Sequence, residues 1–182
     1  MILAFDTATS FGAVCGTSTG ARGRAARSGD LLAAVDGIVD DPAAIEAIVV
    51  GRGPGSFTSI RIGLAIARSL ALSLDVPVAG ASTLDAYAGA TPVIDARRGE
   101  VFAPGPVVCR PEELDVAGAT LVGDGAIRYR DVFEAAGAEV PPDDDNAHVP
   151  DPLLLLELAG SFGAAELVEP LYVREPDARP SQ

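Results

Sequence analysis

The chain has 182 residues, a formal net charge of −13 and no lysine, so every basic residue is an arginine. A chain this acidic has no broad electrostatic attraction for nucleic acid, which excludes binding through a wide phosphate-neutralising surface. Its length suffices for one domain or two small lobes without disulfides or a structural metal, and Cys15 and Cys109 are expected to be buried, reduced thiols.

The first half of the sequence alternates short apolar runs with helical patterns, which is typical of an α/β layer fold. Strands are predicted at residues 2–6, 11–20, 22–27, 45–51, 76–80 and 91–95. Helices are predicted at residues 29–39, with Ser28 or Asp30 as the N-cap, at 58–74, and over a short stretch at 82–88.

The second half repeats the opening plan. VIDARRGEVF (93–102) echoes ILAFDTATSFGAV (2–14): an apolar strand, a terminal aspartate, a polar turn and a second strand. The echo indicates a duplicated fold. The remaining predicted elements are helices at 110–114, 127–137 and 152–160, a strand at 119–123 and an extended segment at 169–174. The expected domains are an N-terminal lobe (1–90), a reduced C-terminal lobe (91–174) and a disordered tail (175–182).

The glycine-rich stretch GRGPGSFTS (51–59) precedes the longest predicted helix. It lacks the lysine of a P-loop and the third glycine of a dinucleotide-binding turn. Pro54 and Gly55 suit a type II turn, and Ser56, Thr58 or Ser59 can cap the helix. The loop is therefore either a rigid corner or an anion site at the helix start, with Arg52 or Arg61 nearby.

The helix at 58–74 carries small residues four apart, at Gly63, Ala67 and Ala71. These positions lie on one helix face and permit the close approach of another element. Spacing alone leaves open whether that element is a partner helix or the rest of the same fold.

No set of residues in the sequence resembles a catalytic centre. The single histidine, His148, lies in an Asp/Pro-rich loop and is expected to be exposed, and no His/Cys cluster or Ser–His–Asp set can be assembled. The run Asp143–Asp145 is either a solvated turn or a site for a hard cation. Asp6 and Asp95, at strand ends, are placed like active-site acids or turn caps.

The chain resembles the TsaB (YeaZ) family. The motifs that carry the resemblance are DTAT (6–9), GRGPGSFTSIRIG (51–63), STLDA (82–86), DARRGEVF (95–102) and PLYVR (170–174). The resemblance implies an actin-like ATPase (ribonuclease H-like) duplicated α/β fold, with two lobes that each have a mixed sheet flanked by helices, the second lobe being reduced. The chain departs from the family at two places. It reads RSGDLL just before and at Leu31, where family members often have a histidine, and its second lobe is short.

The resemblance also implies a non-catalytic subunit that dimerises with and activates TsaD, which forms N6-threonylcarbamoyladenosine at position 37 of tRNA. The helices at 29–39 and 58–74 would form the interface, which assigns the small-residue stripe to the partner. The implied interface residues are Leu31, Leu32, Val35, Arg61, Gly63, Ala67, Leu70 and Ala71. The implied remnant of a nucleotide cleft comprises Asp6, Thr7, Thr9, Gly53, Gly55, Ser56 and Asp95.

Further expectations concern cofactors, partners and location. No metal and no cofactor is implied for the chain itself, with ATP or ADP and Mg²⁺ entering only in the complex. The expected partners are a TsaD-like subunit and a TsaE-like ATPase, with a homodimer in their absence and only indirect contact with tRNA. MILAFDTATS has no basic leader and Arg68 interrupts the most apolar run, so a cytoplasmic protein without a membrane span is expected.

Two enzymatic hypotheses remain as alternatives. A metal-dependent glycopeptidase of the M22 type requires metal ligands that the sequence lacks. An autonomous ATP-binding phosphotransferase or carbamoyltransferase would use the Asp6–Thr9 turn for Mg²⁺ and phosphate and Asp95 as a base. It also needs an adenosine-binding glycine loop, for which LVGDGA (121–126) is the candidate.

Overall fold

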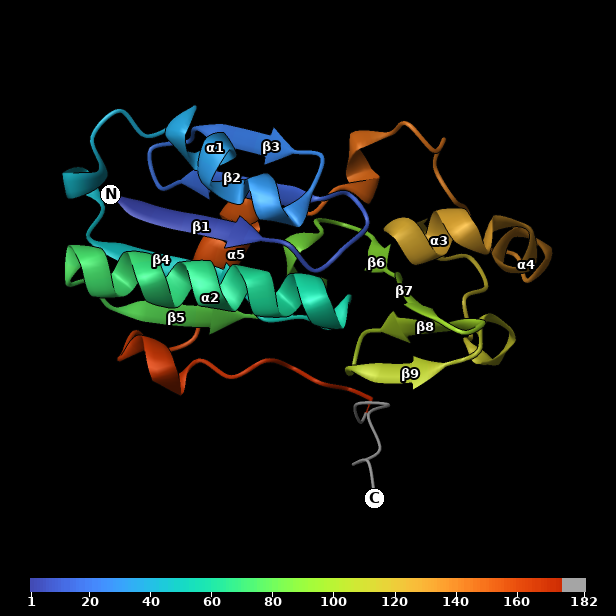
Figure 1. Ribbon diagram of the computed structural model, residues 1–182. Helices are drawn as coiled ribbons and strands as arrows, with labels where there is room; N and C mark the ends of the chain where they lie inside the picture. The colour runs from blue at the N-terminus through green and yellow to red at the C-terminus, as the bar shows by residue number, and fades with distance from the viewer. Residues whose placement is uncertain (175–182) are drawn as a thin grey trace, which may run out of the picture.

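The computed structural model describes residues 1–174, which form two lobes (Figure 1). The tail expected at 175–182 lies outside the described residues. The first lobe is built on a five-stranded mixed sheet in the order β3-β2-β1-β4-β5. Its strands are β1 (Ile2–Asp6), β2 (Ala13–Thr17), β3 (Arg22–Ala25), β4 (Ala47–Gly51) and β5 (Val78–Ala81).

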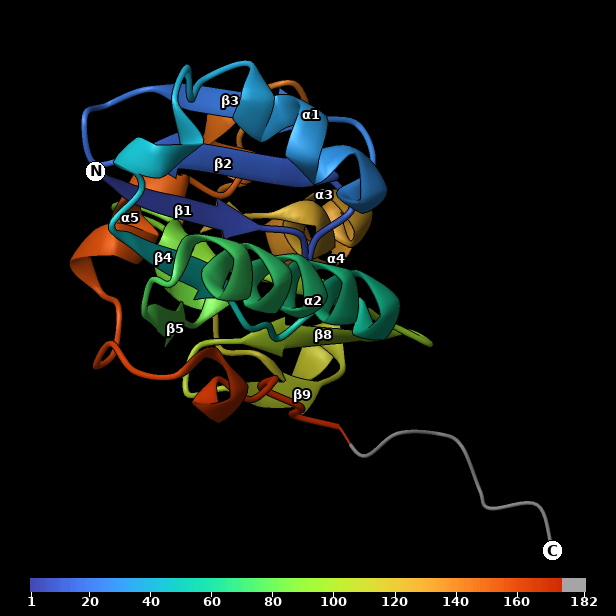
Figure 2. The ribbon, with the colours of Figure 1, turned by 60° about the vertical axis from the view of Figure 1, so that its left-hand side comes forward.

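The central strands are apolar because both faces of the sheet are covered. β1 runs antiparallel to β2 and parallel to β4. On one face lie α1 (Leu31–Asp36), extended at its start by the 3₁₀ turn η1 (Ser28–Asp30), and α2 (Phe57–Leu74) (Figure 2). The opposite face packs on α5 (Pro152–Glu157) and on side chains of the second lobe.

The second lobe repeats the strand order of the first in shortened form. β7 (Ile94–Arg97), β8 (Glu100–Ala103) and β9 (Val107–Cys109) form an antiparallel sheet. β6 (Thr91–Pro92), one residue before β7, runs parallel to β10 (Leu121–Val122). A parallel bridge between Thr120 and Glu139 stands where β5 stands in the first lobe. The predicted duplication and α/β class are confirmed.

The remaining elements are short. α3 (Asp124–Arg128) and α4 (Arg130–Ala135) follow β10, and the 3₁₀ turns are η2 (Pro42–Ala44), η3 (Thr83–Ala86), η4 (Pro111–Glu113), η5 (Asn146–His148) and η6 (Ala165–Leu167). The helix predicted at 29–39 is shorter because it ends at Gly37, and neither Ser28 nor Asp30 makes a side-chain cap. The helix predicted at 127–137 is divided by Tyr129, whose ψ of 27° is not helical.

The last helix packs on the first lobe. α5 follows the strands of the second lobe in the chain, but it returns to pack on β1 and β2. Asp151 caps α5 by accepting a hydrogen bond from the Leu153 amide, and it pairs with Arg22 of β3. Gly163 then bridges Val78 at the edge of β5. Residues 152–172 therefore belong largely to the first lobe.

The small-residue stripe of α2 faces the chain's own core. Ala67 and Ala71 are 1% and 5% exposed, and they pack with the apolar side chains of the first sheet. A Cβ added at Gly63 would lie 2.5 Å from the Thr7 hydroxyl oxygen. The prediction that this stripe is contact surface for a partner is therefore corrected: small residues are needed here because α2 lies close to its own sheet.

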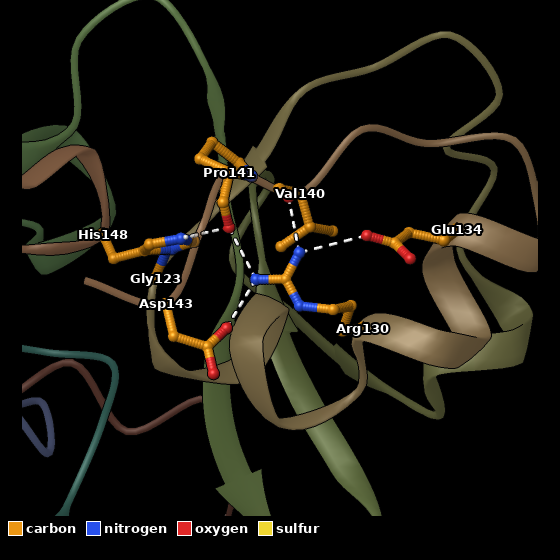
Figure 3. Close-up of polar contacts among 7 residues, drawn as sticks. All are labelled: Gly123, Arg130, Glu134, Val140, Pro141, Asp143 and His148. Atoms are coloured by element: carbon orange, nitrogen blue, oxygen red, sulfur yellow. Dashed lines mark hydrogen bonds and ion pairs between the residues drawn. The ribbon is translucent and has the colours of Figure 1, made fainter. Parts of the chain in front are cut away.

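His148 is fully buried, contrary to expectation (Figure 3). Its Nδ1 accepts a hydrogen bond from the Gly123 amide at 3.1 Å, and its Nε2 lies 3.1 Å from the Pro141 carbonyl oxygen. Arg130 donates to that same carbonyl and to Asp143. The histidine thus fastens the acidic loop to β10, which is a structural role.

The acidic run and the cysteines have local roles. Asp143 pairs with Arg130, and Asp145 caps η5 through the Ala147 amide. Cys15 is buried, which raises the pKa of its thiol to about 11. Cys109 is half-buried rather than buried as expected, and both thiols are free.

We predict that Ala67→Leu lowers the free energy of unfolding by about 1–3 kcal/mol, because the added carbons have no space between α2 and the sheet. Ala65 lies on the exposed side of the same helix, so Ala65→Leu should change that free energy by no more than about 0.5 kcal/mol. Urea denaturation of both variants checks this, and equal midpoints would contradict the assignment of the stripe to the core.

Candidate functional site

A cleft of about 510 Å³ lies between the two lobes. The first lobe contributes the turn after β1 and the start of α2, the second lobe contributes the β7–β8 hairpin and the start of α3, and the C-terminal segment crosses between them. The lining residues are Ala8, Ser10, Gly55, Ser56, Phe57, Thr58, Ile60, Asp95, Ala96, Arg97, Arg98, Phe102, Asp124, Leu171, Tyr172, Val173 and Arg174.

Asp6, at the end of β1, is buried behind this cleft rather than lining it. Its Oδ1 accepts a hydrogen bond from the Ala8 amide at 2.6 Å, and its Oδ2 accepts one from the Thr83 hydroxyl at 2.6 Å. Burial raises the pKa of Asp6, against the lowering effect of those two hydrogen bonds. Both oxygens therefore already have partners within the fold, and the residue acts as an anchor.

Three other residues predicted for a nucleotide cleft also lie behind it. The Thr7 hydroxyl donates to the Ser59 carbonyl oxygen at 2.7 Å, and Thr9 is buried in the same turn. Gly53 donates its amide hydrogen to the Thr83 hydroxyl oxygen at 3.1 Å. These three residues and Asp6 hold the turn and the glycine loop together.

The glycine loop is shaped by its contact with residues 6–9. The Ser56 amide donates to the Ala8 carbonyl oxygen at 2.8 Å, and a Cβ on Gly55 would lie 2.3 Å from that oxygen. Gly55 has φ of 156°, so the predicted type II turn is wrong, since that turn needs about 80°. Ser56 caps α2 by accepting from the Ser59 amide, as one of the predicted alternatives proposed.

Asp124 joins the two lobes at the cleft, although the sequence analysis placed it only within the candidate glycine loop at 121–126. Its carboxylate accepts hydrogen bonds from the Ser10 amide of the first lobe at 2.8 Å and from the Asp95 amide of the second at 2.9 Å. Asp95 pairs in turn with Arg97 at 3.1 Å and with Arg128 at 3.5 Å. Asp95 does line the cleft, as predicted, but its charge is already balanced.

Tyr87 lies near these carboxylates at the junction of the lobes. Its hydroxyl is buried and has no hydrogen-bond partner within the described chain. Burial, together with the negative charges of Asp124 and Asp6, raises its pKa well above the ordinary value. No group of three or more His, Cys, Asp or Glu side chains that could hold a metal occurs among residues 1–174.

The C-terminal segment, residues 171–174, lines the cleft. The Leu171 amide donates to the Arg52 carbonyl oxygen at 2.7 Å. The Tyr172 ring stacks on Phe57 with centroids 5.1 Å apart, and Arg61 lies over Phe57 while donating to the Tyr172 hydroxyl. Arg174 reaches the second lobe, where it donates to the Ala96 carbonyl oxygen and pairs with Glu100. The segment thus links both lobes.

The residues expected at a partner interface divide into two groups. Leu31, Val35, Gly63, Ala67 and Ala71 are buried in the chain's own core and Leu70 is half-buried. Leu32 and Arg61 are exposed on the outer side of α1 and α2. The same side carries Leu72, which is 87% exposed and was not among the predicted residues.

α2 is long and apolar enough to cross a membrane by length and composition alone, with 28% of its residues buried. Its inner face packs on β4 of the first sheet, as expected for a core helix of a globular protein. On its outer side Leu72 remains 87% exposed, whereas Phe57 is partly covered by the Tyr172 ring.

The chain is similar to one protein-family model and to several known proteins. The family model described as "TsaD: tRNA N6-adenosine threonylcarbamoyltransferase" matches residues 34–140. A protein of Haemophilus influenzae named tRNA threonylcarbamoyladenosine biosynthesis protein TsaB is 31% identical, with 71% of this chain and 70% of that protein covered. An uncharacterised protein of Mycobacterium tuberculosis is 33% identical over 83% of this chain and 74% of its own length.

Among solved structures, the chain is similar to a Pseudomonas aeruginosa protein described as uncharacterised "with similarity to peptidase YEAZ". The TM-score is 0.73 at 26% identity, with 95% of this chain and 99% of the other covered. A second structure, YeaZ from the same organism, has a TM-score of 0.71 at 24% identity and supports the fold.

We predict that Asp6→Asn becomes relatively more stable as the pH rises. The folded pKa of Asp6 lies above its ordinary 3.8, so the carboxyl's contribution to stability is full below that value and is lost as the pH rises through the folded pKa. Asparagine keeps the acceptor for the Ala8 amide and has no charge to bury. Urea denaturation of both proteins between pH 4 and pH 7.5 (about the range in which both are expected to fold) measures the difference. A difference that is independent of pH would show that burial does not penalise this charge.

Proposed function

Because the chain belongs to the TsaB (YeaZ) family, we propose that it takes part in forming N6-threonylcarbamoyladenosine at position 37 of tRNA, as a non-catalytic subunit that binds and activates a TsaD-like catalytic subunit. The curated relatives carry this pathway in their names. In this proposal the chain contributes a rigid helical surface, and chemistry takes place on the partner.

The observation that carries the proposal is the exposed outer row of α2, which consists of Phe57, Arg61, Ala65, Ser69 and Leu72. Phe57 and Leu72 are 39% and 87% exposed, and Leu32 of the neighbouring α1 is 51% exposed. The row follows the three- and four-residue spacing of one helix face. Apolar side chains along one helix face are the feature that a helical partner would cover.

The inner residues support this surface from behind. The buried Leu31, Val35, Gly63, Ala67 and Ala71 fix α1 and α2 on the sheet, so the outer row is presented without a conformational change. We propose that two copies pair through this row when the catalytic subunit is absent, and that the catalytic subunit replaces one copy. A preformed surface reduces the ordering cost of association.

The net charge of the chain bears on how the proposed complex would hold tRNA. With a net charge of −13 the chain has little attraction for RNA, so the proposed complex holds tRNA mainly through its other subunits. A TsaE-like ATPase joins the complex, ATP or ADP with Mg²⁺ enters there, and the setting is the cytoplasm. The saturated oxygens of Asp6 support the non-catalytic assignment, because they already accept hydrogen bonds from the fold.

We predict that Leu72→Asp prevents co-purification with the TsaD-like subunit of the same organism and abolishes the gain in threonylcarbamoyladenosine formation on mixing the two proteins. Its urea midpoint should match that of the unmodified chain, because Leu72 contacts little of its own fold. Val107→Asp is the matched control: Val107 is 43% exposed on β9, away from α2, and association should persist.

Three measurements test the proposed non-catalytic role and the proposed interface: the activity of each protein alone, the activity of the mixture, and the size of the complex. Modification by this chain alone would overturn the non-catalytic assignment. An intact, active complex with Leu72→Asp would place the interface elsewhere.

A further inference from the structure

We propose that the open edge of β3 is a docking site for a partner protein, and that the partner adds an extended acidic segment to the first sheet as a further strand antiparallel to β3. β3 does not belong to the outer row of α2, so this site is independent of the proposed function.

β3 is the outermost strand of the first sheet (Figure 2). The Thr17 amide of β2 donates to the carbonyl oxygen of Ala21, the residue just before β3. Hydrogen-bonded pairs recur at every second residue of an antiparallel ladder, so Gly23 and Ala25 also bond to β2. The residues between them point their backbone groups away from β2.

The outward backbone groups of β3 belong to Arg22 and Arg24. Their amide hydrogens and carbonyl oxygens have no hydrogen-bond partner among residues 1–174. A row of unpaired backbone donors and acceptors at a sheet edge is a template for another strand.

This edge is basic in an acidic protein. Residues 7–29 contain three arginines, Arg22, Arg24 and Arg27, and no aspartate or glutamate, so their formal charge is +3 in a chain of net charge −13. All three residues are exposed. Asp151 pairs with Arg22 and balances one of the three charges. A net attraction for acidic groups remains at Arg24 and Arg27.

Arg24 is held in place with most of its donors open. Its Nε donates to the Phe11 carbonyl oxygen at 3.3 Å, and its guanidinium lies 5.5 Å from the centroid of the Phe11 ring. The N–H groups on its two terminal nitrogens find no acceptor among residues 1–174. They suit a carboxylate, which accepts parallel N–H bonds from one guanidinium.

A groove of about 430 Å³ lies between β3 and residues 146–152. Arg22 and Arg24 line it together with Asn146, Val149 and Pro150. The groove gives room to those side chains of an added strand that lie on the same face as the two arginines.

The two faces of this edge favour different side chains, because alternate residues of a strand point to opposite faces. On the face opposite to Arg24, a Cβ on Gly23 would lie 2.8 Å from the Ala34 carbonyl oxygen of α1. Ala34 and Ile38 of that helix are apolar and partly buried. A fitting segment therefore alternates acidic residues, which pair with the arginines, and apolar residues, which pack beside α1.

A second copy of this chain does not fit the edge. The outward backbone groups belong to Arg22 and Arg24, so an antiparallel pairing of two β3 strands places arginine directly opposite arginine. Like charges in that position are destabilising. The arginines therefore favour an acidic partner over self-association.

Isothermal titration calorimetry on the full chain tests the site with the synthetic peptide acetyl-TVEVEVT-amide, and with acetyl-TVKVKVT-amide as its control. We expect the acidic peptide to bind and the lysine peptide not to bind. Arg24→Glu should weaken binding of the acidic peptide at least tenfold, because a like charge replaces the cation. Arg110→Ala removes an exposed arginine of the second lobe and should leave the affinity unchanged.

Two measurements on the unmodified chain test the backbone pairing. N-methylation of both glutamates of the peptide should abolish binding, because in an antiparallel pair the residues opposite Arg22 and Arg24 exchange the hydrogen bonds. Hydrogen–deuterium exchange at the Arg22 and Arg24 amides should slow when the peptide is present.

Four outcomes would overturn the site. They are no binding of the acidic peptide at about 1 mM, equal binding by Arg24→Glu, equal binding of the N-methylated peptide, and unchanged exchange at the two amides. A chain that fails to bind the peptide would leave the arginines with the role of preventing edge pairing. All of these measurements use the isolated chain, so they are independent of any complex with a catalytic subunit.

Discussion

The structure depends on a buried carboxylate for which residues 1–174 supply no cationic partner. Asp6 ends the central strand of the first sheet, and two neutral donors, the Ala8 amide and the Thr83 hydroxyl, hold its charge. A buried charge is costly unless it is hydrogen-bonded, so the residues around Asp6 have little freedom. A Cβ on Gly51 would lie 1.7 Å from Oδ2, which requires glycine at the end of β4. A Cβ on Gly55 or Gly63 would lie 2.3 Å from the Ala8 carbonyl oxygen or 2.5 Å from the Thr7 hydroxyl oxygen, in the turn that follows Asp6. The glycine-rich loop is therefore explained by close packing around Asp6.

This packing holds the first lobe together, and two further contacts link the first lobe to the second. Asp124 bridges the Ser10 and Asp95 amides at the floor of the cleft. The C-terminal segment spans its side, from the Arg52 carbonyl to the β7–β8 hairpin through Arg174. The complete elements of the second lobe lie at the cleft. Its sheet has lost the full equivalent of β5, yet the hairpin, the start of α3 and the arginine contacts at the cleft are complete.

The sequence predicts the elements well where local pattern suffices. β1 and β4 are apolar runs closed by a polar or glycine residue, and the echo at 93–102 indicates the duplication. The sequence does not predict which element a residue packs against, because that depends on the tertiary fold. The spacing of Gly63, Ala67 and Ala71 defines a face but not its neighbour, which proves to be the chain's own sheet. His148 follows an acidic loop, and only tertiary folding brings it to Gly123. Asp124 has one partner 114 residues away, a separation that no local pattern reports.

The outer row of α2 and the cleft are not separate features, because Phe57 belongs to both and Arg61 of the row contacts Tyr172, which lines the cleft. Phe57 lines the cleft, and Arg61 holds the Tyr172 hydroxyl at its rim. A protein that covers the outer row must contact this Phe57–Arg61–Tyr172 cluster, and a ligand in the cleft meets the same cluster from the other side. Two binding events that share residues influence each other only if each favours one arrangement of those residues. Tyr172 and Arg174 lie on one short segment, which ties α2 to the hairpin of the second lobe. Any movement of the segment on partner binding therefore reaches Ala96 and Glu100 directly. For the proposed partner, the contacts of Tyr172 and Arg174 would connect its surface on α2 to the cleft.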